Sequence, residues 1–175
     1  MGLNYQNLDD RTRQLMLQEF NYDIECDNCY LSKRFSDHGK NCFVEIMPEH
    51  ILVGNDDSLA ENLKSADCFL THEERKTKSG TTLAKVPDTA SQTFAEGEFN
   101  RFYIRALAFR ALEEGKQLEV YRARASSNPR LESENLIGKH FNAEQLLTDL
   151  RENKGIDTAF GLPSGPNSGL SVKLE

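Results

Sequence analysis

The stretch EFNRFYIRALAFRALEEGKQLEVYRAR, residues 98–124, decides the fold that this sequence predicts. At about 100° per residue, its apolar side chains point in nearly every direction around a helix. A helix that is apolar on all sides is buried inside a domain. Gly115 supplies the left-handed residue that commonly ends a helix. We therefore predict a central buried helix over about 98–114, followed by a strand over 116–124.

Arginines interrupt the apolar pattern of the predicted helix. Arg101 and Arg105 are four residues apart, so they share one stripe. General burial preferences favour this stripe as the only solvent-facing edge of the helix. Arg110 points to the other side, where Glu114 at i+4 is its local candidate partner. The functional alternative is that one or more of these arginines bind an anionic ligand or a partner carboxylate.

The predicted strand begins apolar and ends basic on one face. Leu118 and Val120 are followed at period two by Arg122 and Arg124, and a turn of small polar residues separates them from Arg130. One interpretation is that the strand leaves the core and its arginines are solvated. The alternative is a small anion-binding site made from Arg122, Arg124, Arg130 and the amides of the turn.

Composition limits the classes of function. The chain has 175 residues, of which 38% are hydrophobic, enough for the core of one domain. Its net charge of −7 disfavours general nucleic-acid binding, because neutralising phosphates requires a basic face, although a local patch within 101–130 is not excluded. The first 20 residues lack the pattern of a signal peptide, and no apolar run approaches the length of a membrane span. We expect a cytoplasmic protein without membrane association.

Four metal-binding side chains lie close together in the sequence: Cys26, Cys29, His38 and Cys42. Zinc binds four Cys or His ligands, and short spacings let two ligands come from one turn. Cys26 and Cys29 form one such pair, and His38 and Cys42 share a helix face as the other. The sequence thus makes zinc the one candidate cofactor. The alternative is that the cysteines are small apolar fillers and that His38 is a loop residue.

Helical periodicity predicts further helices in the first part of the chain. The first covers about 9–24, and the second begins after Ser36 or Asp37. Pro48 is expected to interrupt the second helix, because proline removes an amide donor and clashes with the preceding turn. The third helix covers about 58–65.

The segment THEERKTKSG, residues 71–80, has the composition of a charged loop. Residues 81–86 alternate sufficiently to predict a strand, and we expect it to share one sheet with 116–124. Asp88 can cap a further helix, and Gly97 is expected to bend this helix just before the central one.

The C-terminal part divides into a helix and a tail. Asn142 has the pattern of a capping residue for a helix over about 143–153. Residues 1–154 are predicted to form one globular domain, and 155–175 a tail rich in Gly, Pro and Ser. This tail is either flexible or wraps the domain, adding an edge strand through Leu170, Val172 and Leu174.

The predicted fold class is α+β, a single helix-rich domain with a small sheet. No G-x-S-x-G sequence, P-loop or glycine-rich dinucleotide motif is found, so an enzyme is disfavoured. The first hypothesis is a non-enzymatic interaction or regulatory module, of bacterial type, with a protein partner. The alternatives are nucleic-acid or anion binding through the arginines of 101–130, and a small zinc-containing domain.

Overall fold

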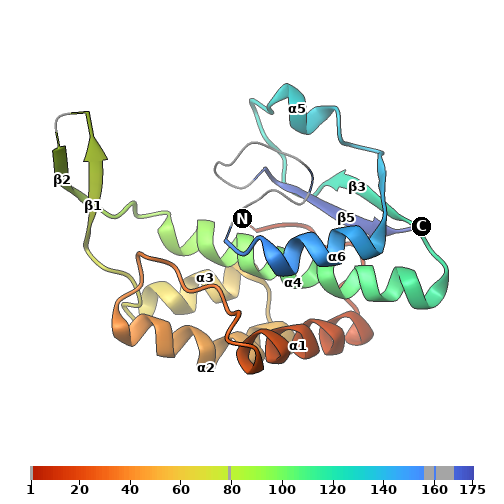
Figure 1. The fold of residues 1–175 in the computed structure, drawn as a ribbon, viewed down its shortest axis with the longest axis horizontal. Coiled ribbons are helices and arrows are strands. Elements are labelled where there is room, and N and C mark those ends of the chain that lie inside the picture. The colour runs from red at the N-terminus through yellow and green to blue at the C-terminus, as the bar shows by residue number, and fades with distance from the viewer. Residues whose placement is uncertain (1, 79, 156–159, 161–167) are drawn as a thin grey trace.

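Helix α4, Ala90–Glu114, lies at the centre of the fold, with helices on one side and a small sheet on the other (Figure 1). The computed structural model describes residues 2–78, 80–155, 160 and 168–175. Within them the fold is α+β, which confirms the predicted class. The other helices are α1 (Asp10–Glu25), α2 (Asp37–Val53), α3 (Asp56–Ser65), α5 (Leu131–Glu134) and α6 (Ala143–Glu152).

The prediction of a buried central helix is confirmed, but the helix is longer than predicted. It begins at Ala90 and continues through Gly97 as one helix. Its apolar residues are almost entirely shielded from solvent, because α1, α3, α6 and the sheet all pack against it. Gly115 ends α4 with a φ of 65°, in the left-handed region that favours glycine.

Helix α2 also runs further than predicted. The expected interruption at Pro48 is wrong, since the helix continues to Val53. Met47 and Ile51, on either side of the proline, are both fully buried. Their packing against the core outweighs the amide hydrogen bond that proline removes, because tertiary burial routinely overrides local propensity.

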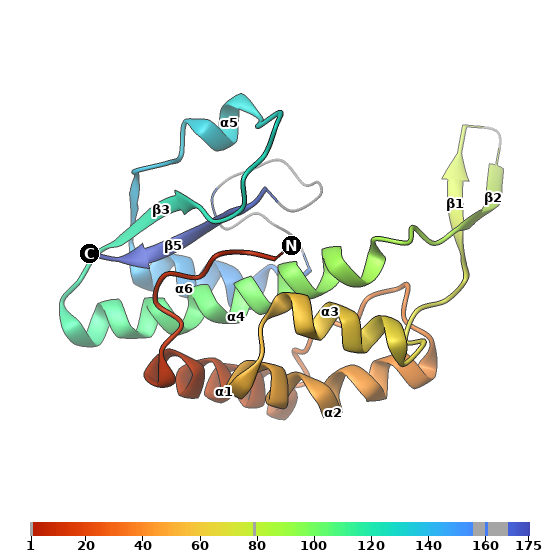
Figure 2. The ribbon, with the colours of Figure 1, turned by 180° about the vertical axis from the view of Figure 1, so that it is seen from behind.

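The segment predicted as a charged loop forms a strand instead. Strand β1 (His72–Thr77) pairs antiparallel with β2 (Gly80–Lys85), so the backbone groups on its inner edge are paired although its side chains are polar. This hairpin projects from the body beyond α3 (Figures 1 and 2). The expectation that the strand near residue 81 joins the strand after α4 is therefore wrong.

The second sheet has the order β4-β3-β5 and lies across α4. Its strands are β3 (Leu118–Arg122), β4 (His140–Phe141) and β5 (Leu170–Leu174), and both pairings are antiparallel. Strand β5 is one of the two edge strands, and an edge strand was one of the two outcomes that the sequence left open for the tail. Leu170 and Val172 are buried against α4 and seal the sheet onto the core.

The first residues of the chain are fixed to both layers. The Leu3 amide donates to Asp56 Oδ2 at 2.9 Å, and the Asn4 amide donates to the Ala123 carbonyl at 2.9 Å. This segment runs between α3 and the sheet, as seen in Figure 2. It closes one side of the space around the N-terminal half of α4.

Candidate functional site

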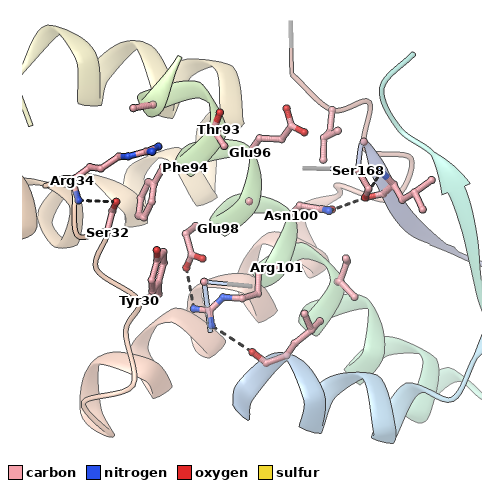
Figure 3. A pocket seen from close by; sticks show the side chains of 18 residues that line it. Tyr30, Ser32, Arg34, Thr93, Phe94, Glu96, Glu98, Asn100, Arg101 and Ser168 are labelled. Carbon is pink, nitrogen blue, oxygen red and sulfur yellow. Dashed lines mark hydrogen bonds and ion pairs between the residues drawn. The ribbon is translucent and has the colours of Figure 1, made fainter. Parts of the chain in front are cut away.

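A cavity of about 200 Å³ lies beside the N-terminal half of α4 (Figure 3). We call it the α4 cavity. The chain that follows α1 forms one wall, α4 forms the floor, and residues just before and within β5 form the opposite wall. Its lining includes Tyr30, Ser32, Arg34, Phe94, Glu96, Gly97, Glu98, Asn100, Arg101, Ile104, Leu150, Gly169 and Leu170.

Part of the α4 cavity is aromatic and apolar. The rings of Tyr30 and Phe94 stack with centroids 5.9 Å apart at an interplanar angle of 28°. Ile104 and Leu150 contribute aliphatic surface. Such a mixture of apolar walls and a few polar groups is typical of small-molecule sites, although this cavity is smaller than the pockets of about 300–1,000 Å³ that hold drug-sized ligands.

The polar centre of the cavity is the pair Glu98 and Arg101. Glu98 Oε2 lies 3.0 Å from Arg101 Nη2, and both side chains are only 5% exposed. This ion pair lacks hydrogen-bond geometry: among the described residues, Glu98 Oε2 and Arg101 Nε have no hydrogen-bond partner. Burial raises the pKa of the Glu98 carboxyl above its usual value, while the neighbouring Arg101 opposes this shift. Buried polar atoms normally find partners, so this acceptor and donor are exceptional.

Behind the cavity, buried charges continue across three helices. Arg101 Nη2 lies 3.1 Å from Asp23 Oδ2, and Arg105 Nη1 lies 2.7 Å from the same oxygen. Arg105 Nε donates to Glu19 Oε2 at 2.7 Å, and Arg151 Nη2 lies 2.7 Å from Glu19 Oε1. We call this alternating chain of acids and arginines the buried charge chain: Glu98, Arg101, Asp23, Arg105, Glu19 and Arg151.

The buried charge chain corrects one sequence-based prediction. Arg101 and Arg105 were expected at the solvent-facing edge of the helix, but they are 5% and 0% exposed. The physical reason is that α1 supplies Asp23 and Glu19, which pair with them in the interface. Arg110 does pair with Glu114, at 2.9 Å, as predicted, and it also reaches Asp9.

The strand arginines have separate environments. Arg122 Nη2 lies 2.5 Å from Glu134 Oε1, and Arg124 Nη1 lies 2.5 Å from Glu96 Oε2. Arg130 is exposed at the start of α5. Of the five arginines in the candidate anion site, Arg101 lines the α4 cavity, and Arg124 pairs with Glu96, which also lines it.

The structure brings together two of the four predicted metal ligands. One atom each of His38, Cys42 and Cys68 lies within 4.8 Å of the others. Cys26 is exposed at the end of α1, and Cys29 lies near Glu98, where burial raises its thiol pKa to about 12. Neither of them belongs to this cluster in the part of the chain that the structure describes.

Sequence reasoning named Arg101 as a candidate binding residue but missed Glu98, its partner at the centre of the α4 cavity. Glu98 stands inside the stretch that was predicted as buried, and an acid in such a helix needs a partner or a reason for its burial. Asp23 and Glu19 lie at helical spacing beside the apolar face of α1. Those two signals were present, but they could not indicate which arginine meets which acid.

Comparison with protein-family models, with curated protein sequences and with solved structures finds no significant match. Every helix in the described part of the chain is too short or too polar to cross a membrane. The function must therefore be argued from the geometry of the site.

Proposed function

We propose that the protein is a non-enzymatic binding module that holds a small planar ligand with a carboxamide-like edge in the α4 cavity. The observation that carries the proposal is a buried pair of atoms, Glu98 Oε2 and Arg101 Nε, that have no hydrogen-bond partner among the described residues. Glu98 Oε2 does lie 3.0 Å from Arg101 Nη2 in an ion pair. A buried donor without a hydrogen bond costs about 1–3 kcal/mol. At Glu98 Oε2 the ion pair with Arg101 Nη2 offsets part of this cost. A ligand that bonds to both atoms recovers this free energy on binding.

The two atoms define the chemistry of the ligand. Arg101 Nε–H can only donate, so the ligand must present an acceptor there. An ionised Glu98 can only accept, so the ligand must present a donor beside that acceptor. A carboxamide or the edge of a nucleobase carries both groups in one plane. The stacked rings of Tyr30 and Phe94 offer an apolar surface for the rest of a planar molecule.

The buried charge chain supports this role by fixing Arg101. Its Nη2 is held by Asp23, and its Nη1 donates to the Leu150 carbonyl at 3.4 Å. Nε is therefore presented by a guanidinium that does not need to reorganise when a ligand binds. Preorganised donors give affinity because little conformational entropy is lost.

Benzamide is a suitable probe, because it is planar and carries one carboxamide. In ¹H–¹⁵N NMR spectra, we expect it to shift the amide signals of cavity residues such as Gly97, Asn100 and Gly169. Gly97→Leu should abolish these shifts by filling the cavity, whereas the matched control Gly97→Ala should retain them. Both variants improve helix propensity, so the comparison separates cavity volume from stability. Shifts that persist in Gly97→Leu, or no shifts with benzamide, adenine or uracil, would contradict the proposal.

A second candidate function, polyanion binding, is favoured by the β1–β2 hairpin. Its strands are exposed nearly throughout, and Lys76 and Lys78 lie towards its tip. An isolated two-stranded hairpin is marginal in water, so a partner would stabilise it. If the hairpin binds duplex DNA or RNA, Lys76→Ala with Lys78→Ala should weaken binding and reduce its salt dependence. Equal binding by the wild type and this variant would exclude the hairpin as the contact.

A further inference from the structure

A cluster of metal-binding side chains lies where the start of α2 meets the segment after α3. His38 and Cys42 are one helical turn apart in α2, and Cys68 follows the end of α3. The ligand atoms of all three lie within 4.8 Å of one another. Cys68 is fully buried, Cys42 is partly buried, and His38 is exposed. The sequence alone could not reveal Cys68 as a member, because it is far from the other two along the chain.

The position of Cys68 is fixed by its backbone. Its carbonyl accepts from the Ser36 amide at 2.9 Å and from Ser36 Oγ at 3.2 Å. A Cβ on Gly39 would lie only 1.9 Å from the Cys68 carbonyl oxygen, so glycine permits this close approach. The loop after α3 is thus attached to the first turn of α2. This attachment holds Cys68 next to the two ligands of that helix.

The histidine is also positioned. His38 Nε2 lies 3.2 Å from the Ala66 carbonyl oxygen, on the same loop that carries Cys68. Metal-binding histidines commonly use one ring nitrogen for such a contact, which orients the ring. An isolated antiparallel β-bridge between Phe35 and Phe69 also joins the chain before α2 to the chain after α3.

Two thiols and one imidazole form a set of ligands that prefers certain metal ions. Soft sulfur ligands with imidazole nitrogen suit Zn²⁺ in a tetrahedral arrangement, and disfavour Ca²⁺ and Mg²⁺, which take oxygen ligands. Burial, and then the adjacent Cys42 thiol, raise the pKa of Cys68 to about 12, so without a nearby cation this thiol stays protonated. A bound metal ion would reverse that preference by its charge.

We propose that His38, Cys42 and Cys68 are three ligands of a zinc site that joins the start of α2 to the end of α3. On binding, each of the two thiols releases its proton to solvent as its sulfur bonds to the metal, and the neutral imidazole donates a nitrogen lone pair. Because His38 is exposed, the fourth coordination position faces the surface, where water can serve as the ligand. Cys26 and Cys29 have no part in this site.

Cobalt(II) tests the site, because it takes the same geometry and its thiolate complexes absorb strongly. The reduced protein titrated with Co²⁺ should develop thiolate-to-metal charge-transfer bands and the intense visible bands of a tetrahedral ion, and Zn²⁺ should displace it. His38→Ala and Cys68→Ser should each weaken binding by at least about 10- to 100-fold, the loss seen for a single supporting residue of a metal site. His38 is exposed, so its variant should fold even if Cys68→Ser does not.

The matched control is the double variant Cys26→Ser with Cys29→Ser, which should bind Co²⁺ as the wild type does. Loss of binding in this control, with retention in Cys68→Ser, would overturn the proposal. So would the absence of tetrahedral bands in the reduced wild type. A further contrary result is a cluster that forms a Cys42–Cys68 disulfide in air but binds no metal after that disulfide has been reduced.

Discussion

Arg105 Nη1 lies 2.7 Å from Asp23 Oδ2, and neither side chain is exposed to solvent at all. The two residues are 82 positions apart in the sequence. Their contact joins α1 to α4 through charge as well as through apolar packing. Removing charges from water is costly, so the pair persists only because each group is fully provided with partners.

Replacing Asp23 should therefore destabilise the protein strongly. Asp23→Ala removes a carboxylate that pairs with both Arg105 and Arg101, and leaves both guanidinium groups buried. Breaking a buried pair in this way costs about 3–5 kcal/mol, which urea denaturation would measure as a lower free energy of unfolding. Asp88→Ala removes the exposed partner of Lys85 and serves as the control, with no resolvable change expected. Similar effects of the two substitutions would contradict this account.

The pH dependence of stability should show the burial of Glu98. The pKa of its carboxyl is raised above the usual 4.5, so above that pH the folded protein retains a proton that the unfolded chain has released. Stability from this group is present below pH 4.5 and is lost as the pH rises through the raised pKa. The Glu98→Gln variant has no ionisable group at this position, so this contribution to the pH dependence of its stability is absent.

The measurement is the free energy of unfolding of both proteins at several pH values. The difference should move in favour of Glu98→Gln as the pH rises above about 4.5. Asp56, whose pKa is also raised by burial, contributes equally to both proteins and cancels. A difference that does not change with pH would show that Glu98 titrates normally.

Gly39→Ala should destabilise the attachment of the loop to α2. The added Cβ would meet the backbone oxygen of Cys68 at 1.9 Å, and backbone cannot move aside as a flexible side chain can. Overpacking of this kind costs about 1–3 kcal/mol, despite the better helix propensity of alanine. Asn41→Ala, at an exposed position of the same helix, is the control for propensity in thermal or chemical unfolding. A stabilised Gly39→Ala variant would exclude the close approach.

Shortening the β1–β2 hairpin should leave the body intact. The Val86 amide donates to the Thr71 carbonyl at 2.9 Å, so the base of the hairpin is closed by its own bond. Replacing residues 74–83 by Asn-Gly keeps Glu73 opposite Ala84 and supplies a favoured two-residue turn. Glu73 is retained because it pairs with Arg34 of the body at 2.7 Å. The melting temperature should change by no more than about 2–4 °C, since the strands pack mainly on each other. A larger fall would mean that the hairpin supports the core.

The sequence predicted correctly the elements in which the capping residues and the apolar pattern indicate the same structure. In α6, Asn142 accepts from the Gln145 amide at 2.9 Å, and Leu146, Leu147 and Leu150 are buried, as the local pattern indicates. The central position of α4 followed from apolar residues on all its sides. These predictions succeed because they depend on neighbouring residues only.

The predictions that failed depend on distant residues. The segment after Thr71 forms a strand because a second strand pairs with it, and α2 passes Pro48 because the core holds both sides of the proline. Arg101 and Arg105 are buried because α1 brings acids to them. The α4 cavity and the cluster at Cys68 are likewise made by segments that meet only in the folded chain.

The buried charge chain also determines how α1 is aligned on α4. Apolar contacts are non-directional, so Met16 and Phe20 alone would tolerate a slide of one helical turn. Such a slide would put Leu15 in the place of Glu19 and leave Arg105 short of a carboxylate. We expect the ion pairs to fix the register of the two helices, because their charges are all paired in only one of the alignments that the apolar faces would permit.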